Sequence, residues 1–530
     1  MDFEHEPSRF NRADCGAKSA AIIQSSRRPE QYSESSRTAV APRFFCTIDR
    51  IGNCEYALRI ELFVAMNSST ETSAGGLSHR APRRELGLAS AVAAVAGETI
   101  AVGIFLTPAE MAKSLGSPFY LLLVWVVVGI LTVCGALTYG ELAARFPRDG
   151  GVYVFLEETF GRGTAFLYGW MCLLVLDPGL TAALGVGLAG YFGYILPLSS
   201  IAMKLVAMGV IWLLCALNML SIRLSAGVLR WSTWLKLGLL AVLVLWGFSL
   251  RLGSWSNFLP FVAQRPGSLP LLPALGAAMV GAFFSFGGWW DVSKISGEVR
   301  DAGRTLPRAM LFGTLLVTAV YILVSAVFLY LTPLAGVTSN QTFVAQAGSV
   351  LFGPLGGKIF AAIVIVCVFS SLAALIMSAP RVYYAMAQDG LFFRRVSEIS
   401  PRFGTPLSAI LIQGTISSVL VAVSSFQKII EYFIFIAVVF LAMAGAGLIL
   451  ARWRNIGTAP LFRAPLYPVP VIIFLLLITT LLVLLAGHSP IQAGLGGAVV
   501  LAGIPAYWLF RSREHPRHRN LSPAEIAERA

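Results

Sequence analysis

Long apolar runs, each about the length of a bilayer-spanning helix, recur along the chain from Leu86 onward. A spanning helix needs roughly 20 mostly apolar residues, and short polar connections separate the runs. The pattern therefore predicts an all-α integral membrane protein with twelve transmembrane helices. The predicted spans are residues 86–113, 118–145, 164–193, 200–222, 224–250, 271–296, 306–331, 357–386, 406–423, 429–451, 468–486 and 490–510.

The beginning of the chain has a different pattern. Residues 1–65 mix Arg, Ser, Glu and Pro with little apolar periodicity, which is typical of disordered segments. Met66 opens a short polar and basic leader directly before the first span, which favours Met66 as the biological start. We therefore expect a disordered extension at residues 1–84, a transporter domain at residues 85–511 and a cytoplasmic tail at residues 512–530.

Composition strengthens the membrane interpretation. The chain has 530 residues, of which 56% are hydrophobic and only 13% are charged, whereas soluble proteins carry about 25% charged residues. This excludes a secreted enzyme, a disulfide scaffold and a nucleic-acid binder. In a soluble protein, a net charge of +13 would indicate an anionic partner. In a membrane protein, basic residues can instead mark the cytoplasmic side, so their positions in the connections between the spans must be considered first.

Basic residues are concentrated in alternate connections between the predicted spans. Twenty-four Lys and Arg residues fall on one side and six on the other, and the richer side of a membrane protein is normally cytoplasmic. The 24 include Lys294, assigned to the connection after the sixth span. This asymmetry predicts an even number of spans, with both termini cytoplasmic, in the plasma (cell inner) membrane.

Two predicted spans contain glycines near their middle. The first reads AVAAVAGETIAVGIFLTPAEM, with Gly97 and Gly103, and the sixth reads GAAMVGAFFSFGGWWDVSKIS, with Gly287 and Gly288. Either set alone can be explained by close helix packing. Interruptions at corresponding places in two halves of a chain, however, are typical of the substrate site of secondary transporters with inverted repeats.

Interrupted helices have chemistry suited to a zwitterion. A break exposes amide groups at the start of the second half-helix, which favour an anion, and carbonyl groups at the end of the first, which favour a cation. An α-amino acid carries one group of each kind. The paired interruptions therefore predict an amino acid site.

Several motifs, in order along the chain, resemble one family. They are AGETIAVGIFLTP, LTYGELAARFPRDGGVYVFLEETFG, FSFGGWWDVSKISGEVRDAGRTLPRAM, PRVYYAMAQDGLF and LFRAPLYPVPV. The chain resembles the amino acid–polyamine–organocation (APC) superfamily, and within it the L-type amino acid transporter branch. The resemblance covers Glu85 to Arg511 and implies a LeuT-like core of two inverted repeats of five spans each, with spans 1 and 6 broken and spans 11 and 12 peripheral.

The resemblance also implies the residues that contact substrate. The carboxylate would meet amides in the first break, the ammonium would meet carbonyls in the second, and the Phe284 ring would close the path to the outside. Ala101-Val102-Gly103 replaces the family's usual Gly-Ser-Gly, so we expect a narrower or differently shaped carboxylate cradle. The implied binding residues are Ile100, Ala101, Val102, Gly103, Phe284, Ser285, Phe286 and Gly287.

Three charged residues inside predicted spans are candidates for coupling. Lys236 lies thirteen residues after Arg223 and fifteen before Arg251, about 20 Å of helix each way, so it cannot reach either surface and must face a polar interior. It is either a proton carrier or a permanent charge replacing the sodium ion of sodium-coupled relatives. Glu98 lies in the first interruption, where it indicates proton coupling, a preference for cationic substrates, or a structural role in stabilising the interruption. Asp177 precedes a proline and is expected either to cap the resulting kink or to relay protons.

The most consistent function is a secondary active amino acid transporter that works by alternating access, through proton-coupled symport or amino acid exchange. The alternatives are an amine or polyamine transporter of the same fold and a non-transport membrane protein. The five histidines lie in tails or loops, and we find no nucleotide-binding loop, metal cluster or catalytic constellation, so we expect no enzyme activity, cofactor or nucleic-acid partner. Residues 194–201 contain no cysteine, so we expect no disulfide-linked heavy subunit of the kind that animal relatives use.

Overall fold

The computed structural model describes residues 84–334, 343–400, 402–423, 426–488 and 490–511. These residues belong to the second of two units into which the chain divides, His79–Ala530. The predicted extension up to residue 83, including Met66, and the predicted tail at 512–530 lie outside the described residues.

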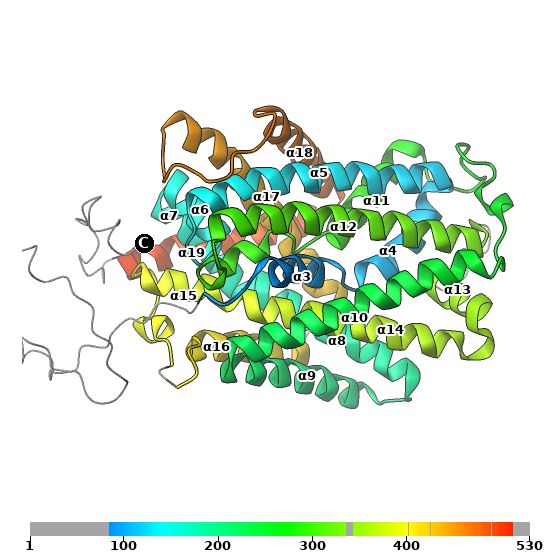
Figure 1. Ribbon diagram of the computed structural model, residues 1–530, viewed down its shortest axis with the longest axis horizontal. Coiled ribbons are helices and arrows are strands. Elements are labelled where there is room, and N and C mark those ends of the chain that lie inside the picture. The colour runs from blue at the N-terminus through cyan, green and yellow to red at the C-terminus, as the bar shows by residue number, and fades with distance from the viewer. Residues whose placement is uncertain (1–83, 335–342, 401, 424–425, 489, 512–530) are drawn as a thin grey trace, which may run out of the picture. The chain divides into compact units, whose positions relative to one another are not determined.

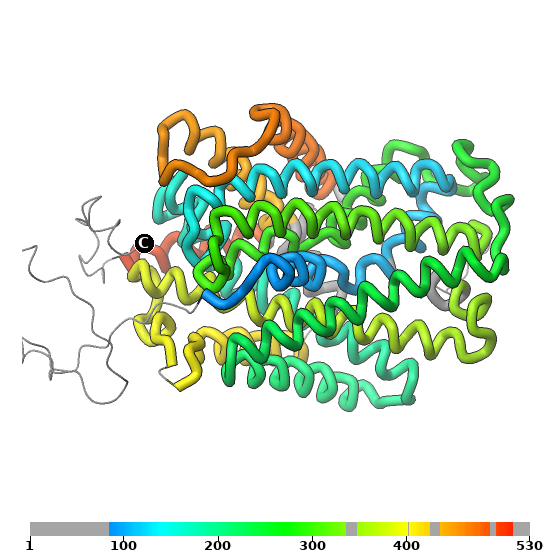
Figure 2. Tube along the Cα trace, viewed as in Figure 1, coloured from blue at the N-terminus to red at the C-terminus, as the bar shows by residue number. Residues whose placement is uncertain are grey.

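Regular structure in the described ranges is helical, and one isolated β-bridge joins Leu86 to Val299. Eight helical stretches are long and apolar enough to cross a membrane, so the chain is a multi-pass membrane protein. Figures 1 and 2 show the long helices lying roughly side by side. In chain order the α-helices are α3 (Leu88–Thr99), α4 (Gly103–Leu115), α5 (Pro118–Arg145), α6 (Val152–Phe160), α7 (Arg162–Met171), α8 (Asp177–Ile195), α9 (Ser200–Leu220), α10 (Ile222–Ser249), α11 (Leu271–Ser285), α12 (Ala302–Leu331), α13 (Phe343–Phe352), α14 (Gly356–Ser378), α15 (Pro380–Gln388), α16 (Leu407–Val423), α17 (Phe426–Trp453), α18 (Val469–His488) and α19 (Pro490–Arg511).

The helix ends follow local sequence signals. Ser199 and Ser221 cap α9 and α10, each accepting a hydrogen bond from a backbone amide three residues later. Pro118 occupies the first turn of α5, where its missing N–H costs nothing. Apolar helices shorter than a membrane span include α3 and α11, the segments that the sequence predicts to be interrupted.

Close packing around α12 brings the interrupted helices together. Helix α12 packs against α5 and α3, and α11 packs against α4. A β-carbon on Gly313 of α12 would lie only 2.5 Å from the Val95 side chain of α3, so the glycine allows these two helices to approach closely. The fold therefore holds α3, α4, α11 and α12 in one group.

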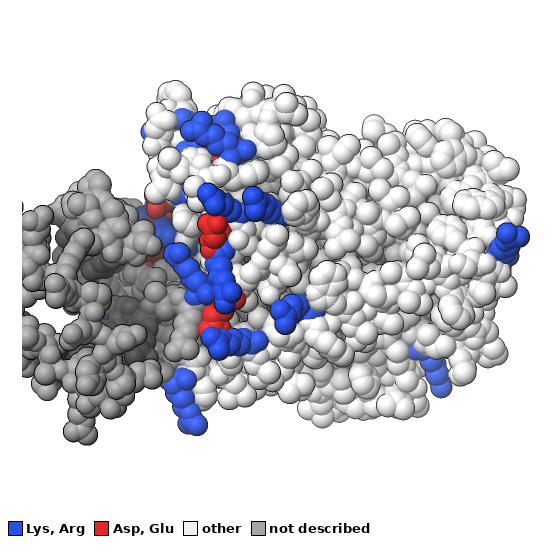
Figure 3. Space-filling model, viewed as in Figure 1, with Lys and Arg blue, Asp and Glu red and all other residues white. Residues whose placement is uncertain are grey.

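Charged side chains gather at one end of the helices. On the face shown in Figure 3, most Lys and Arg side chains lie at the end where α6, α7 and α15 are found. At this end Arg381 contacts Glu298 at 2.9 Å, and the amide of Gly297 donates to the Asp149 carboxylate at 2.6 Å. The segment preceding α12 is thus fixed to two neighbouring segments by polar contacts.

Candidate substrate-binding site

Two helix interruptions lie next to each other at the centre of the fold. Helix α3 ends at Thr99 and α4 begins at Gly103, while α11 ends at Ser285 and a 3₁₀ segment, η4, covers Asp291–Glu298. A β-carbon on Gly103 would lie 2.7 Å from the Cα atom of Ser285. The start of α4 therefore touches the end of α11, and only glycine leaves room for this contact.

Tyr321 of α12 joins the two interruptions. Its hydroxyl lies 2.8 Å from the carbonyl oxygen of Thr99 and 2.6 Å from that of Ser285, in hydrogen-bonding positions to the last residue of both helices. Its ring packs against Trp125 and Phe286. Sequence reasoning missed Tyr321 because a tyrosine within an apolar run looks like a packing residue.

Lys236 of α10 holds the end of α3. Its ammonium group donates to the carbonyl oxygens of Gly97 and Ile100 at 2.7 and 2.6 Å, and to Cys367 and Ser371 at 3.2 Å. The side chain is fully buried. The C-terminal end of a helix carries partial negative charge, so the ammonium lies where a cation is stabilised without a carboxylate partner.

A pocket lies between the two interruptions and is lined by residues of both. Ile100 and Phe286 do not line the pocket: the carbonyl of Ile100 faces Lys236, and the ring of Phe286 packs against Trp125. Lys236 and Asp177 also lie outside its lining. The predicted residues that do line it are Glu98, Ala101, Val102, Gly103, Phe284, Ser285 and Gly287.

Two of the backbone amides predicted to meet the substrate carboxylate already have acceptors within the chain. The amide of Ile100 donates to Ala96 at 3.0 Å, and the amide of Ala101 donates to Thr99 at 2.9 Å, so both are already engaged within the chain. The first turn of α4 begins at Gly103, and the first amides of any helix lack helical acceptors. The start of α4 can therefore present amides to an anion.

The pocket walls are mostly apolar. Leu176, Leu180 and Leu184 recur at every fourth residue and form one wall, and Leu441 of α17 contributes to another. Trp290 also lines the pocket and stacks on Phe283. The leucine spacing was a usable signal in the sequence, but which face of the helix meets the pocket depends on packing that a single sequence does not reveal.

Lys294 was wrongly assigned to the basic connection after the sixth span. It is fully buried in η4, and its ammonium lies 2.9 Å from Asp177 and 2.8 Å from Asp291. The Tyr383 hydroxyl lies 3.3 Å from the other carboxylate oxygen of Asp177. A buried ammonium requires partners of opposite charge, and Asp291, three residues earlier in the chain, was an available indication.

Glu98 occupies the pocket beside Gly288. Gly288 has a left-handed φ of +103°, and a β-carbon there would lie 2.7 Å from Cγ of Glu98. The Ser378 hydroxyl lies 3.4 Å from both carboxylate oxygens of Glu98, and the Asp291 carboxyl interacts with it directly. Across the described ranges, no group of three or more His, Cys, Asp or Glu residues is placed to hold a metal ion.

A multi-pass helical fold with a pocket between two interrupted helices is typical of membrane transport proteins. The family model for amino acid permeases matches residues 86–504, so the chain belongs to the amino acid permease family. This confirms the resemblance to the APC superfamily and the predicted function in amino acid transport.

Individual relatives match over nearly the same length. The serine/threonine exchanger SteT of Bacillus subtilis is 29% identical over 440 residues, covering 82% of this chain and 98% of SteT. The human large neutral amino acids transporter small subunit 2 is 29% identical over 454 residues, covering 84% and 83%. The human cystine/glutamate transporter is 26% identical over 437 residues, covering 81% and 85%.

Proposed function

We propose that this permease is a secondary active transporter that moves amino acids by alternating access. In this proposal, residues 85–511 form twelve spans around a LeuT-like core of two inverted five-helix repeats. The observation that carries the proposal is the pocket between α3–α4 and α11–η4, lined by both interruptions. Helix ends at such a site present amides to a carboxylate and carbonyls to an ammonium.

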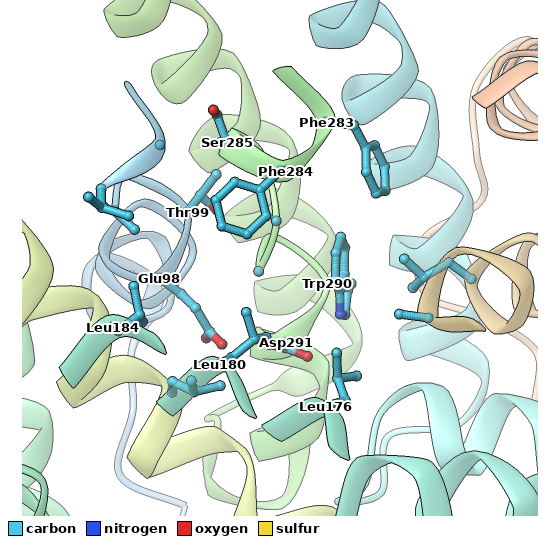
Figure 4. A pocket seen from close by; sticks show the side chains of 18 of the residues that line it. Glu98, Thr99, Leu176, Leu180, Leu184, Phe283, Phe284, Ser285, Trp290 and Asp291 are labelled. Carbon is cyan, nitrogen blue, oxygen red and sulfur yellow. The ribbon is translucent and has the colours of Figure 1, made fainter. Parts of the chain in front are cut away.

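Two features support the proposed binding mode. Gly103, at the start of α4, lines the same pocket as Phe284 and Ser285, at the end of α11. A substrate carboxylate at Gly103 and an ammonium near Ser285 would thus lie in the same pocket. The Phe284 ring also lies in the pocket (Figure 4), where it is placed to cover a bound substrate.

The driving force in this proposal is amino acid exchange or proton-coupled symport, without sodium. Lys236 supports the absence of sodium coupling, because its ammonium already occupies the cluster of oxygens from Gly97, Ile100 and Ser371. Exchange is favoured by similarity to a relative described as a serine/threonine exchanger.

We further propose a plasma (cell inner) membrane location with both termini cytoplasmic. The gathering of Lys and Arg side chains at one end of the described helices supports this orientation. We also propose that the chain works without a disulfide-linked heavy subunit, since residues 194–201 lack cysteine. The four described cysteines are buried and unbonded.

Amine or polyamine transport is a second candidate function. Glu98 and Asp291 place two carboxyl groups on the lining of the pocket, and carboxylates bind ammonium groups readily. An amine that lacks a carboxylate would leave the start of α4 without a ligand, which makes this candidate secondary.

Transport by the purified protein in liposomes tests the proposed function. A panel of labelled amino acids and amines would be offered to liposomes that are empty, preloaded with unlabelled amino acid, or subjected to an inward proton gradient. Uptake stimulated by preloading indicates exchange, and uptake stimulated by the gradient indicates symport. Uptake of putrescine but of no amino acid would reject the main proposal in favour of amine transport.

A further inference from the structure

Asp177, Asp291 and Lys294 form a buried ion cluster beside the pocket. The Lys294 ammonium lies 2.9 Å from a carboxylate oxygen of Asp177 and 2.8 Å from one of Asp291, and none of the three side chains is more than 3% exposed. Asp291 lines the pocket, whereas Asp177 lies outside its lining. The ion cluster therefore connects the pocket with the helices packed beside it.

The two carboxylates of the ion cluster belong to different parts of the fold. Asp291 lies three residues before Lys294, so both belong to the short segment η4. Asp177 is the first residue of α8, and the Tyr383 hydroxyl of α15 lies 3.3 Å from its second carboxylate oxygen. The same hydroxyl lies 2.5 Å from the side-chain oxygen of Gln413 in α16. Lys294 thus joins η4 to a separate polar network on α8, α15 and α16.

The ion cluster lies between the pocket and the charged end of the helices. Segment η4 begins at Asp291, which lines the pocket, and ends at Glu298, which contacts Arg381 at the charged end. Lys294 is midway along this segment, and Tyr383 belongs to α15, which lies at the same end in Figure 1. Because the three side chains of the ion cluster are buried, the path from the pocket toward this end, which we propose to be cytoplasmic, is closed at the cluster.

The two contacts of Lys294 differ in what happens to them when such a path opens. Movement of η4 away from α8 separates Lys294 from Asp177, whereas Asp291 moves together with the lysine. A buried charge that loses every partner strongly destabilises a protein, but Lys294 keeps one carboxylate in either arrangement. Asp177 is then reached by the water that enters the opened path, where an ion pair contributes little. The contact between Lys294 and Asp177 can therefore be broken and remade.

We propose, building on the proposed alternating access, that Lys294 is a positioning residue whose contact with Asp177 holds the pocket closed toward the cytoplasm. Asp291 keeps the lysine paired while the path is open. The two carboxylates then have opposite effects: loss of Asp177 removes an interaction of the closed state, and loss of Asp291 removes the partner on which the open state depends. A merely structural ion cluster gives changes in the same direction for both.

Thiol labelling of the pocket from the cytoplasmic side tests this proposal. Ala437 is buried and lines the pocket, so Ala437→Cys reports the entry of a membrane-impermeant maleimide into the pocket of the full-length chain in inside-out membrane vesicles. We expect Asp177→Asn to increase the labelling rate roughly tenfold, the effect of one hydrogen bond to a charged group, and Asp291→Asn to decrease it. Asp177→Glu, which keeps the charge, should stay near the rate of the parent chain.

Two controls identify the source of the labelling. The chain without Ala437→Cys gives the background from the native cysteines. Ala207→Cys, at a fully buried position of α9 outside the pocket lining, reports a general loosening of the fold and should stay equally protected in all variants. An increase at both reporter positions in Asp177→Asn, or a change in the same direction in Asp177→Asn and Asp291→Asn, would overturn the proposal.

Labelling requires no substrate, so its outcome is separate from that of the transport measurement. If the two asparagine variants shift labelling in opposite directions but liposomes take up no amino acid, the ion cluster controls access to the pocket and the proposed transport function fails. If amino acid uptake is found and neither variant changes labelling at Ala437→Cys, the transport function stands and the role given to Lys294 is wrong.

Discussion

Lys236 and Ile100 meet where helix α3 ends: the ammonium nitrogen lies 2.6 Å from the Ile100 carbonyl oxygen. The same ammonium reaches Gly97 one turn earlier, so a single buried charge compensates the carbonyl groups that the interruption leaves without helical donors. The lysine thereby fixes one side of the pocket. Its removal should affect both stability and transport.

Replacement of Lys236 by methionine should strongly reduce uptake. The variant keeps most of the side-chain volume but loses the donor to Gly97, Ile100 and Ser371, and each hydrogen bond to a charged group contributes about 1.5–3 kcal/mol. We expect at least a roughly tenfold loss of uptake in liposomes and a lower melting temperature. The exposed Lys113→Met is the control. Sodium should not stimulate the wild-type protein; wild-type activity that requires sodium would contradict the role given to Lys236.

Replacement of Tyr321 by phenylalanine should remove the hydrogen bonds that join the two interruptions without leaving a cavity in the core. The ring contacts with Trp125 and Phe286 persist, but the hydroxyl that reaches Thr99 and Ser285 is lost. We expect a loss of about 1–3 kcal/mol in unfolding free energy together with weaker substrate binding. Thermal unfolding with and without substrate measures both. Tyr194→Phe, at an exposed tyrosine, should change neither.

An alanine at Gly103 should disrupt the site by steric conflict. Its β-carbon would lie 2.7 Å from the backbone of Ser285, and a backbone contact of this kind is relieved only by moving α4 away from α11. Overpacking of this type costs about 1–3 kcal/mol, and we expect loss of uptake. The matched control is Gly190→Ala in α8, where the added carbon meets no atom within 4 Å. Equal activity of the two variants would show that the close approach is unnecessary.

Removal of one partner of the buried Lys294–Asp177 ion pair should lower the stability of the protein much more than removal of both partners. Lys294→Met leaves Asp177 and Asp291 without their nearest cation, and an unpaired buried charge costs roughly 3–5 kcal/mol. Adding Asp177→Asn should recover part of that loss. Melting temperatures of the two single variants and the double variant give the coupling. If the effect of the double variant equals the sum of the effects of the two single variants, the Lys294–Asp177 contact contributes little to stability.

Asp149 should make stability depend on pH. Burial and the neighbouring Glu298 carboxyl raise the pKa of Asp149 to about 7, from about 4 in the unfolded chain. Because the folded state binds this proton more tightly, the associated stability is present at low pH and is lost as pH rises from about 4 through about 7. Asp149→Asn cannot ionise, so we expect its melting temperature relative to wild type to increase from pH 5 to pH 8. A difference that stays constant over this range would contradict the prediction, and Asp301→Asn, at an exposed carboxylate, is the control.

Much of the helical fold can be predicted from apolar runs. The predicted segment 118–145 coincides with α5, and the predicted segment 200–222 differs from α9 only at its end. The glycine-containing stretches of the first and sixth spans coincide with the ends of α3 and α11. Helix α13, at Phe343–Phe352, was not predicted, because ten residues are too few for a span.

The candidate site could be predicted only where backbone breaks mark it. Val102, Gly103 and Phe284 line the pocket, and their contact with substrate, which the family resemblance implies, stays a prediction. Asp291, three residues before Lys294, gave a local indication of its burial, but the contacts of Lys294 with Asp177 and of Tyr321 with Thr99 join other helices more than a hundred residues away. Such contacts depend on how helices rotate against each other, and hydrophobic periodicity alone does not define this rotation.

A structure of the full-length protein with bound amino acid tests most directly whether the paired interruptions form the substrate site. The ligand should be the amino acid that the liposomes take up best. We predict its carboxylate at the start of α4, near Gly103, and its ammonium near the end of α11, at Ser285. Density for the ligand at another place, with the pocket between α3–α4 and α11–η4 unchanged and empty, would contradict this assignment.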